Sequence, residues 1–153
     1  MGDAGIATIE RFIPHRPPMR LIDRLIEADD EGVVVEADVP LQGRFVDDGA
    51  MPTWVGIELM AQAISAWAGA RAHRRGQPTK LGMLLGTRRF RIRRTSLPAG
   101  ATVRIHVRCE LLADHGLGMF DCHIKLGDET VASAYVSVFE PDDSVSYLAQ
   151  GES

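Results

Sequence analysis

The sequence contains few cysteines, and their spacing does not suggest ligands. Cys109 and Cys122 are the only two, and they do not form a CxxC motif. No cluster of histidines or acids lies near them, so we expect no structural zinc site. A chain with so little cysteine is typical of a reducing compartment, and we expect a cytoplasmic protein.

An excess of basic residues is also absent. Lysine and arginine number 17 against 21 acidic residues, which gives a net charge of −4. This balance argues against nucleic acid as the main partner. Residues 1–18 lack a basic region followed by an apolar one, so no secretory signal is expected. With 153 residues and no internal repeat, we expect one domain over 1–153, with a core over about 9–141 and a frayed tail over 142–153.

One long apolar run is present, at residues 51–70 (MPTWVGIELMAQAISAWAGA). It is long enough to raise the question of a membrane span. Glu58, Gln62 and the arginines that follow the run instead favour a buried helix without membrane contact. Pro52 favours a helix start and Gly76 a helix stop, which predicts one long helix between them.

Strands are predicted on both sides of this helix. Two precede it at residues 20–27 and 32–39, and four follow it, including 103–111, 120–126 and 131–139, where apolar residues alternate. The order is an α+β pattern rather than alternating βαβ units. A helix that is apolar on almost every face is covered only if a sheet wraps it and a second subunit closes the rest. That shape is the hotdog fold.

Three polar residues form a stripe along the predicted helix. Glu58 and Gln62 are four residues apart and therefore share a face, which Ser65 extends. One interpretation is a buried hydrogen-bond network that fixes packing or dimer register. The other is a carboxyl group at the floor of an apolar pocket, where loss of solvent would raise its pKa and suit it to proton transfer.

Several motifs in order resemble one enzyme family. They are PHRPPMRLID (14–23), GRF (43–45), MP (51–52), GIELMAQ (56–62), LGMLLGTRRF (81–90) and SLPAG (96–100). They are similar to hotdog-fold β-hydroxyacyl-[acyl-carrier-protein] dehydratases, in particular a divergent branch linked to aryl-polyene pigment synthesis. The resemblance covers roughly residues 9–141.

The resemblance implies a homodimer or higher even oligomer, possibly with a homologous subunit, with active sites at the subunit interface. The substrate would be an acyl chain on the phosphopantetheine arm of an acyl carrier protein, converted from the β-hydroxyacyl to the trans-2-enoyl thioester. Glu58 would give a proton to the leaving hydroxyl, with Gln62 orienting it. The backbone N–H of Thr53, near the helix N-terminus, would polarise the thioester carbonyl. No cofactor or metal is expected.

The chain departs from this family at the catalytic histidine. The family's GHFP segment reads Gly43-Arg44-Phe45-Val46 here, and a guanidinium cannot take the α-proton. His15 is the candidate replacement base, although it could instead pin the turn between its flanking prolines. Three functions stay open. They are a modified dehydratase that uses His15 or Glu58 as base, with Arg44 and Phe45 binding substrate; a thioesterase; and an inactive carrier-binding partner of an active homologue.

Five arginines crowd into residues 88–94 on a predicted strand. Strict alternation places Phe90 and Ile92 on one face and Arg89, Arg91 and Arg93 on the other. The arginines could form a solvated face that discourages edge pairing. Alternatively, Arg88, Arg89 and Arg91 could dock an acidic carrier protein and its phosphate, since arginine suits bidentate phosphate contacts.

Overall fold

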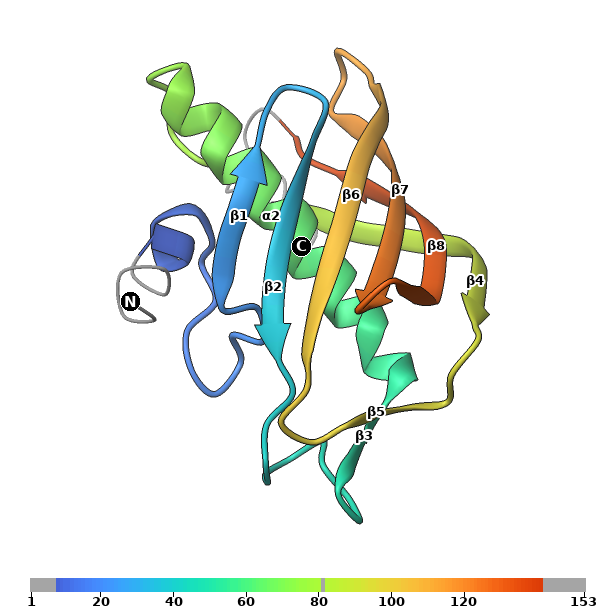
Figure 1. Cartoon of the computed structure of the whole chain (residues 1–153). Coiled ribbons are helices and arrows are strands. Elements are labelled where there is room, and N and C mark those ends of the chain that lie inside the picture. The colour runs from blue at the N-terminus through green and yellow to red at the C-terminus, as the bar shows by residue number, and fades with distance from the viewer. Residues whose placement is uncertain (1–7, 81, 142–153) are drawn as a thin grey trace, which may run out of the picture.

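The fold is a six-stranded antiparallel sheet with one long helix lying across one face (Figure 1). The computed structural model describes residues 8–80 and 82–141, so the tail expected over 142–153 lies outside the described residues. The strand order is β1-β2-β6-β7-β8-β4. The strands are β1 (Arg24–Ala28), β2 (Gly32–Asp38), β4 (Met83–Ile92), β6 (Thr102–Leu112), β7 (Leu117–Leu126) and β8 (Glu129–Phe139).

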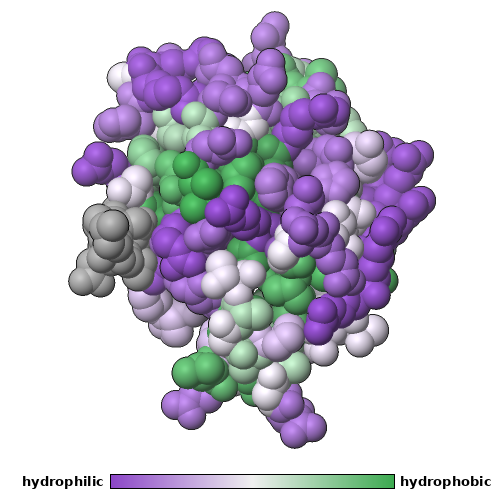
Figure 2. Space-filling view, viewed as in Figure 1, coloured by the Kyte–Doolittle hydropathy of each residue, from purple (hydrophilic) through white to green (hydrophobic). Residues whose placement is uncertain are grey.

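Period-two alternation explains the two faces of this sheet. On β6, Val103, Ile105 and Val107 are all less than 5% exposed and face the helix. Ile105 pairs with Val35 on one side and with Ile124 on the other, so the apolar residues of neighbouring strands meet on the same face. The residues between them are polar and cover much of the outer face, with smaller apolar patches among them (Figure 2). The predicted α+β hotdog arrangement is confirmed.

The central helix α2 (Gly56–Arg74) begins later than predicted. Pro52 is extended rather than helical and belongs to β3 (Ala50–Pro52), which pairs with β5 (Ser96–Pro98) in a two-stranded sheet. A short 3₁₀ helix, η1 (Thr53–Val55), then leads into α2. At the other end Gly76 has a φ of 63°, so the predicted stop is confirmed.

Helix α2 buries one side against the sheet and leaves a stripe less covered. Leu59, Met60 and Ala63 are at most 1% exposed. Partly covered residues recur at helical spacing on the other side: Ile57, Ala61, Ser65 and Ala68. None of the described helices is long and apolar enough to cross a membrane.

Candidate active site

A groove of about 370 Å³ runs between α2, residues 11–15 and the neighbouring ends of β4 and β8. Its apolar wall includes Ile13, Ile64, Leu84 and Val138, and its ionisable groups are Arg11, His15, Glu58, Lys80 and Glu140. A mostly apolar groove of this size with a few polar groups is the usual form of a site for a small molecule. It is therefore the candidate active site.

Glu58 is held by an amide whose hydrogen bonds are all used. Gln62 is fully buried, and its Nε2 donates to Glu58 Oε1 at 3.0 Å and to the Met19 carbonyl at 2.8 Å. Its Oε1 accepts from the backbone N–H groups of Leu21 and Ile22. The amide thus orients Glu58 and ties α2 to residues 19–22.

Glu58 itself is not buried in the single chain. Its side chain is 49% exposed, because it lies on the less covered side of α2. Glu58 lines the groove as one interpretation expected, but the loss of solvent expected with it is not found in the chain alone. Apolarity on almost every face of the helix predicted burial but could not show which stripe the sheet leaves open.

His15 lies next to Glu58 in the groove. Its Nε2 is 4.0 Å from Glu58 Oε1, and its Nδ1 is buried without a hydrogen-bond partner in the described part of the chain. Arg16 fixes the loop that carries it by donating to the carbonyls of Ile13 and Glu10. The distance is too long for a hydrogen bond, so the two groups are neighbours with space for a ligand atom near both.

Arg44 reaches the same region from the loop after β2. Its Nη1 lies 3.7 Å from the Met19 sulfur, and its guanidinium stands 5.6 Å from the centre of the Phe45 ring. Phe45 in turn meets Trp54 edge to face. Met19 thereby contacts both Arg44 and Gln62. Arg44, which stands where the family has its histidine, therefore lies next to the residues that hold Glu58.

Thr53 does not present the free donor predicted from the sequence. It is fully buried, its backbone N–H donates to the Thr95 carbonyl at 3.0 Å, and its hydroxyl donates to the Arg94 carbonyl. These bonds fix the start of η1 against the segment between β4 and β5. The predicted electrophile role is contradicted, because the N–H that should polarise a thioester is already bonded.

The arginine-rich strand β4 places its charges on the face opposite α2. A bulge between Arg88 and Arg91 breaks the alternation, and Arg89 adopts a φ of 54°. Arg88 pairs with Tyr135, and the Arg89 guanidinium stands 5.8 Å from that ring. Strict alternation assigned only Arg89, Arg91 and Arg93 to one face; the bulge brings Arg88 beside Arg89. None of Arg88, Arg89 and Arg91 forms an ion pair within residues 8–80 and 82–141.

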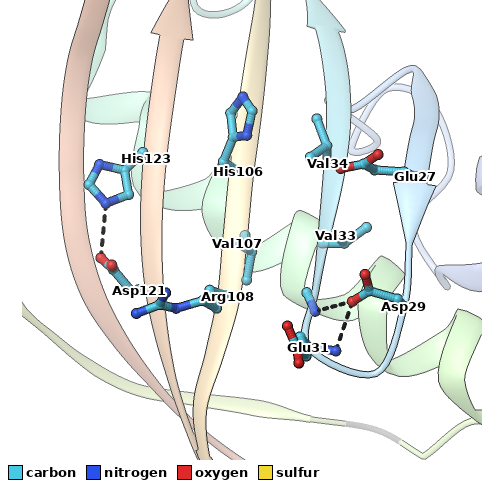
Figure 3. Close-up of a pocket in the computed structure, with 11 residues that line it drawn as sticks. Glu27, Asp29, Glu31, Val33, Val34, His106, Val107, Arg108, Asp121 and His123 are labelled. Carbon is cyan, nitrogen blue, oxygen red and sulfur yellow. Dashed lines mark hydrogen bonds and ion pairs between the residues drawn. The ribbon is translucent and has the colours of Figure 1, made fainter.

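A second hollow, of about 400 Å³, lies on the outer face of β1, β2, β6 and β7 (Figure 3). Two of its acids already have structural partners: Asp29 accepts from the N–H groups of Glu31 and Gly32, and Asp121 lies 3.1 Å from His123 Nε2. Partial burial lowers the pKa of His106, and nearby cations add to the effect. No described residues form a cluster able to hold a metal ion. The hollow carries no arrangement for the predicted chemistry.

One residue in the groove escaped the sequence analysis. Glu140 follows β8 and lines the end of the groove away from Glu58. Burial raises the pKa of its carboxyl group, against a smaller lowering by Lys80 and Arg71. No motif marks an acid at a strand end before a proline, so the sequence carried no signal for it.

The chain is similar in sequence to known dehydratases. The ApeP-like family, described as ApeP dehydratase, matches residues 7–149. The chain is 31% identical over 144 residues to a 3-hydroxyacyl-[acyl-carrier-protein] dehydratase FabZ from Dichelobacter nodosus, covering 86% of this chain and 93% of the relative. The corresponding FabZ from Teredinibacter turnerae is 28% identical, with 86% and 92% covered.

The chain is also similar to solved structures, at two levels of sequence identity. The dehydratase heterocomplex ApeI:P from Xenorhabdus doucetiae contains a chain with a TM-score of 0.85 and 31% identity, covering 93% of this chain and 95% of that one. A hypothetical thioesterase from Streptococcus pneumoniae matches with a TM-score of 0.61 at 14% identity, covering 76% of this chain and 84% of its own, which shows the fold alone. On the family match and the FabZ relatives together, the chain belongs to the ApeP-like dehydratases.

Proposed function

We propose that the protein removes water from a β-hydroxyacyl thioester on acyl carrier protein, giving the trans-2-enoyl thioester. The observation that carries this proposal is the Glu58 carboxyl, held by buried Gln62 and 4.0 Å from His15 in a largely apolar groove. The FabZ relatives are named for this reaction class. A single hotdog domain would carry out this dehydration, in fatty-acid or aryl-polyene-like synthesis. The free thiols of Cys109 and Cys122 fit a cytoplasmic setting.

In the proposed mechanism, neutral His15 takes the α-proton from C2 of the acyl chain. The electron pair of that C–H bond forms the C2–C3 double bond, and the C3–O bond breaks. Glu58 acts in its acid form, which loss of solvent on binding of substrate and a second subunit would favour, and gives its proton to the departing hydroxyl, which leaves as water. Proton transfer from His15 to Glu58 restores the starting state.

Arg44 and Phe45 are assigned to substrate binding rather than to proton transfer. A guanidinium stays charged and can stabilise the developing enolate oxygen or hold the phosphate of the carrier's arm. Its place beside Met19, which accepts a hydrogen bond from Gln62, supports this role.

Carrier docking is assigned to Arg88, Arg89 and Arg91. Their side chains have no acidic partner among the described residues, unlike Arg24, Arg104 and Arg108 elsewhere on the sheet. Because they lie on the outer face of β4, the arm of a docked carrier has to pass the β4 edge to enter the groove. We expect replacement of all three by alanine to lower kcat/KM about tenfold for a carrier-bound substrate and to leave a small pantetheine thioester unaffected.

An assembly of at least two subunits is part of the proposal, either a homodimer or a pair with a homologous subunit. Trp54, Leu84 and Leu85 are between 47% and 60% exposed around the uncovered side of α2 and on the edge strand β4. The similar chain from Xenorhabdus doucetiae occurs in a dehydratase heterocomplex. The absence of the family histidine at Arg44 makes a homologous partner a second possible source of the base.

Product identification tests the function. A β-hydroxyacyl carrier thioester is incubated with the protein alone and with a homologous dehydratase subunit, and intact carrier is analysed by mass spectrometry. Loss of one water is expected, and the His15→Gln variant should slow it about 100-fold. Free acid would instead identify a thioesterase, which the comparisons do not favour. Activity only in the mixture, unchanged by His15→Gln, would assign the base to the partner subunit.

A further inference from the structure

The groove has two polar ends separated by a middle that is apolar on α2 except at Ser65. Glu58 and Ala68 both line it from α2, and ten residues at 1.5 Å each span about 15 Å. His15 lies beside Glu58 at one end, whereas Thr79, Lys80 and Glu140 line the other. The side chains between these ends include those of Ile64, Leu84 and Val138. Such a lining suits a hydrocarbon chain that extends away from the reacting carbons.

The Glu140 carboxylate has no hydrogen-bond donor among the residues that the structure describes. Its backbone N–H is bonded to the Gly116 carbonyl at 2.9 Å, which fixes the residue at the end of β8. No hydrogen bond or ion pair to its carboxylate is found within the described ranges. The residue is only partly exposed, and burial raises the pKa of its carboxyl group. A partly buried acceptor that lacks a donor is costly unless a ligand or water supplies one.

We propose that this end of the groove is a recognition site for the far end of the acyl chain, and that Glu140 accepts a hydrogen bond from a hydroxyl group there. The inference rests on the proposed function, since it takes Glu58 as the reacting end. A chain ending in a methyl group would cover Glu140 with hydrocarbon and offer its carboxylate no hydrogen bond. A chain ending in a hydroxyl would satisfy it, so the site selects between acyl chains of equal length.

Two matched substrates test the site. They are β-hydroxyacyl carrier thioesters of the same length, one ending in a methyl and the other in a hydroxyl group. We expect the wild type to favour the hydroxyl-ended chain about tenfold in kcat/KM. Glu140→Leu should abolish or reverse this preference. Glu129→Gln, an exposed acid at the opposite end of β8, should keep it.

Equal use of both substrates by the wild type, or equal loss of both in Glu140→Leu, would overturn the proposal. Glu140→Gln keeps the side-chain shape, and a fold defect would appear as a loss on the methyl-ended chain as well. If neither thioester is turned over, the proposed dehydratase function fails, and the Glu140 site is then tested by binding alone. Calorimetric binding of the free hydroxyl-ended and methyl-ended fatty acids should then show the same preference in the wild type and none in Glu140→Leu.

Discussion

Gln62 shows how one buried side chain serves both fold and site. Its amide satisfies the N–H groups of Leu21 and Ile22 and the Met19 carbonyl while holding Glu58. Gln62→Leu leaves these backbone groups without partners, at about 1–3 kcal/mol for each that water cannot reach. We expect unfolding in urea to show a loss of about 3 kcal/mol, together with a lower kcat. A variant as stable as the wild type would mean that water replaces the amide.

The site residues were predictable to different degrees. Glu58 and Gln62 could be found because polar residues at i and i+4 stand out in an apolar helix. Three features could not be predicted, since each depends on which distant segment packs nearby. They are the exposure of Glu58, the bonded N–H of Thr53 and the position of Glu140. The placement of Arg88 beside Arg89 could not be predicted either, because a bulge that the residue pattern does not reveal ends the alternation of β4.

Helix α2 approaches the loop that carries His15 through Gly69. A Cβ added at this position would lie 2.0 Å from the Phe12 carbonyl oxygen, a backbone atom that cannot move alone. Alanine normally stabilises a helix relative to glycine by about 1 kcal/mol. Gly69→Ala should instead destabilise the protein by about 1–3 kcal/mol through overpacking and displace residues 11–15, lowering activity.

The control for this prediction is Gly86→Ala on β4, where an added Cβ meets nothing within 4 Å. Thermal unfolding of both variants provides the comparison. A Gly69→Ala protein with a higher Tm and full activity would contradict the close approach of α2 to residues 11–15.

Strands β1, β2 and β6 are linked by an ionic network that predicts sensitivity to acid. Arg24 contacts Glu36 and Asp38 at 2.9 Å and 2.6 Å, and Arg104 contacts Glu36 at 3.0 Å. Hydrogen bonds from Arg24 are the main cause that lowers the pKa of both carboxyl groups. A carboxyl whose pKa is lowered by folding stabilises the protein above its unfolded pKa, and that contribution is lost as pH falls through the folded value.

We therefore expect the urea midpoint to fall as pH drops from about 4.5, the region where free carboxyls begin to protonate. The double variant Glu36→Gln/Asp38→Asn should be less stable at pH 7 and show a flatter acid limb. Glu129→Gln, which removes a more exposed pair at 3.9 Å, is the control and should change little. Parallel acid limbs for the wild type and the double variant would refute the role of the network.

The elements themselves were largely predictable, and the exceptions have physical causes. Strands β2, β6, β7 and β8 carry uninterrupted alternation or apolar runs, so local pattern and tertiary structure agree. The paired strands β3 and β5 are three residues each, too short for any periodicity to appear. The helix was expected from Pro52, but pairing with Ser96 keeps that residue extended.

The described part of the chain exposes large apolar side chains, which the proposed second subunit would cover. Leu85 on edge strand β4 is 58% exposed and Trp54 is 60% exposed. Large apolar side chains exposed together are typical of interaction sites. Leu85→Glu should shift sedimentation from dimer to monomer and reduce dehydration at least tenfold, while the far-ultraviolet circular dichroism stays unchanged. A monomeric wild type with full activity would contradict the proposed assembly.

The most direct test of the account is the rate at which a β-hydroxyacyl carrier thioester loses water with the wild type and with Glu58→Gln. Glu58 is half exposed, so its replacement should leave the thermal unfolding midpoint nearly unchanged. The account predicts that the rate falls at least about 100-fold, because the amide has no proton of suitable acidity for the leaving hydroxyl. A Glu58→Gln protein that loses water within a few-fold of the wild-type rate would show that this carboxyl is not the catalytic acid.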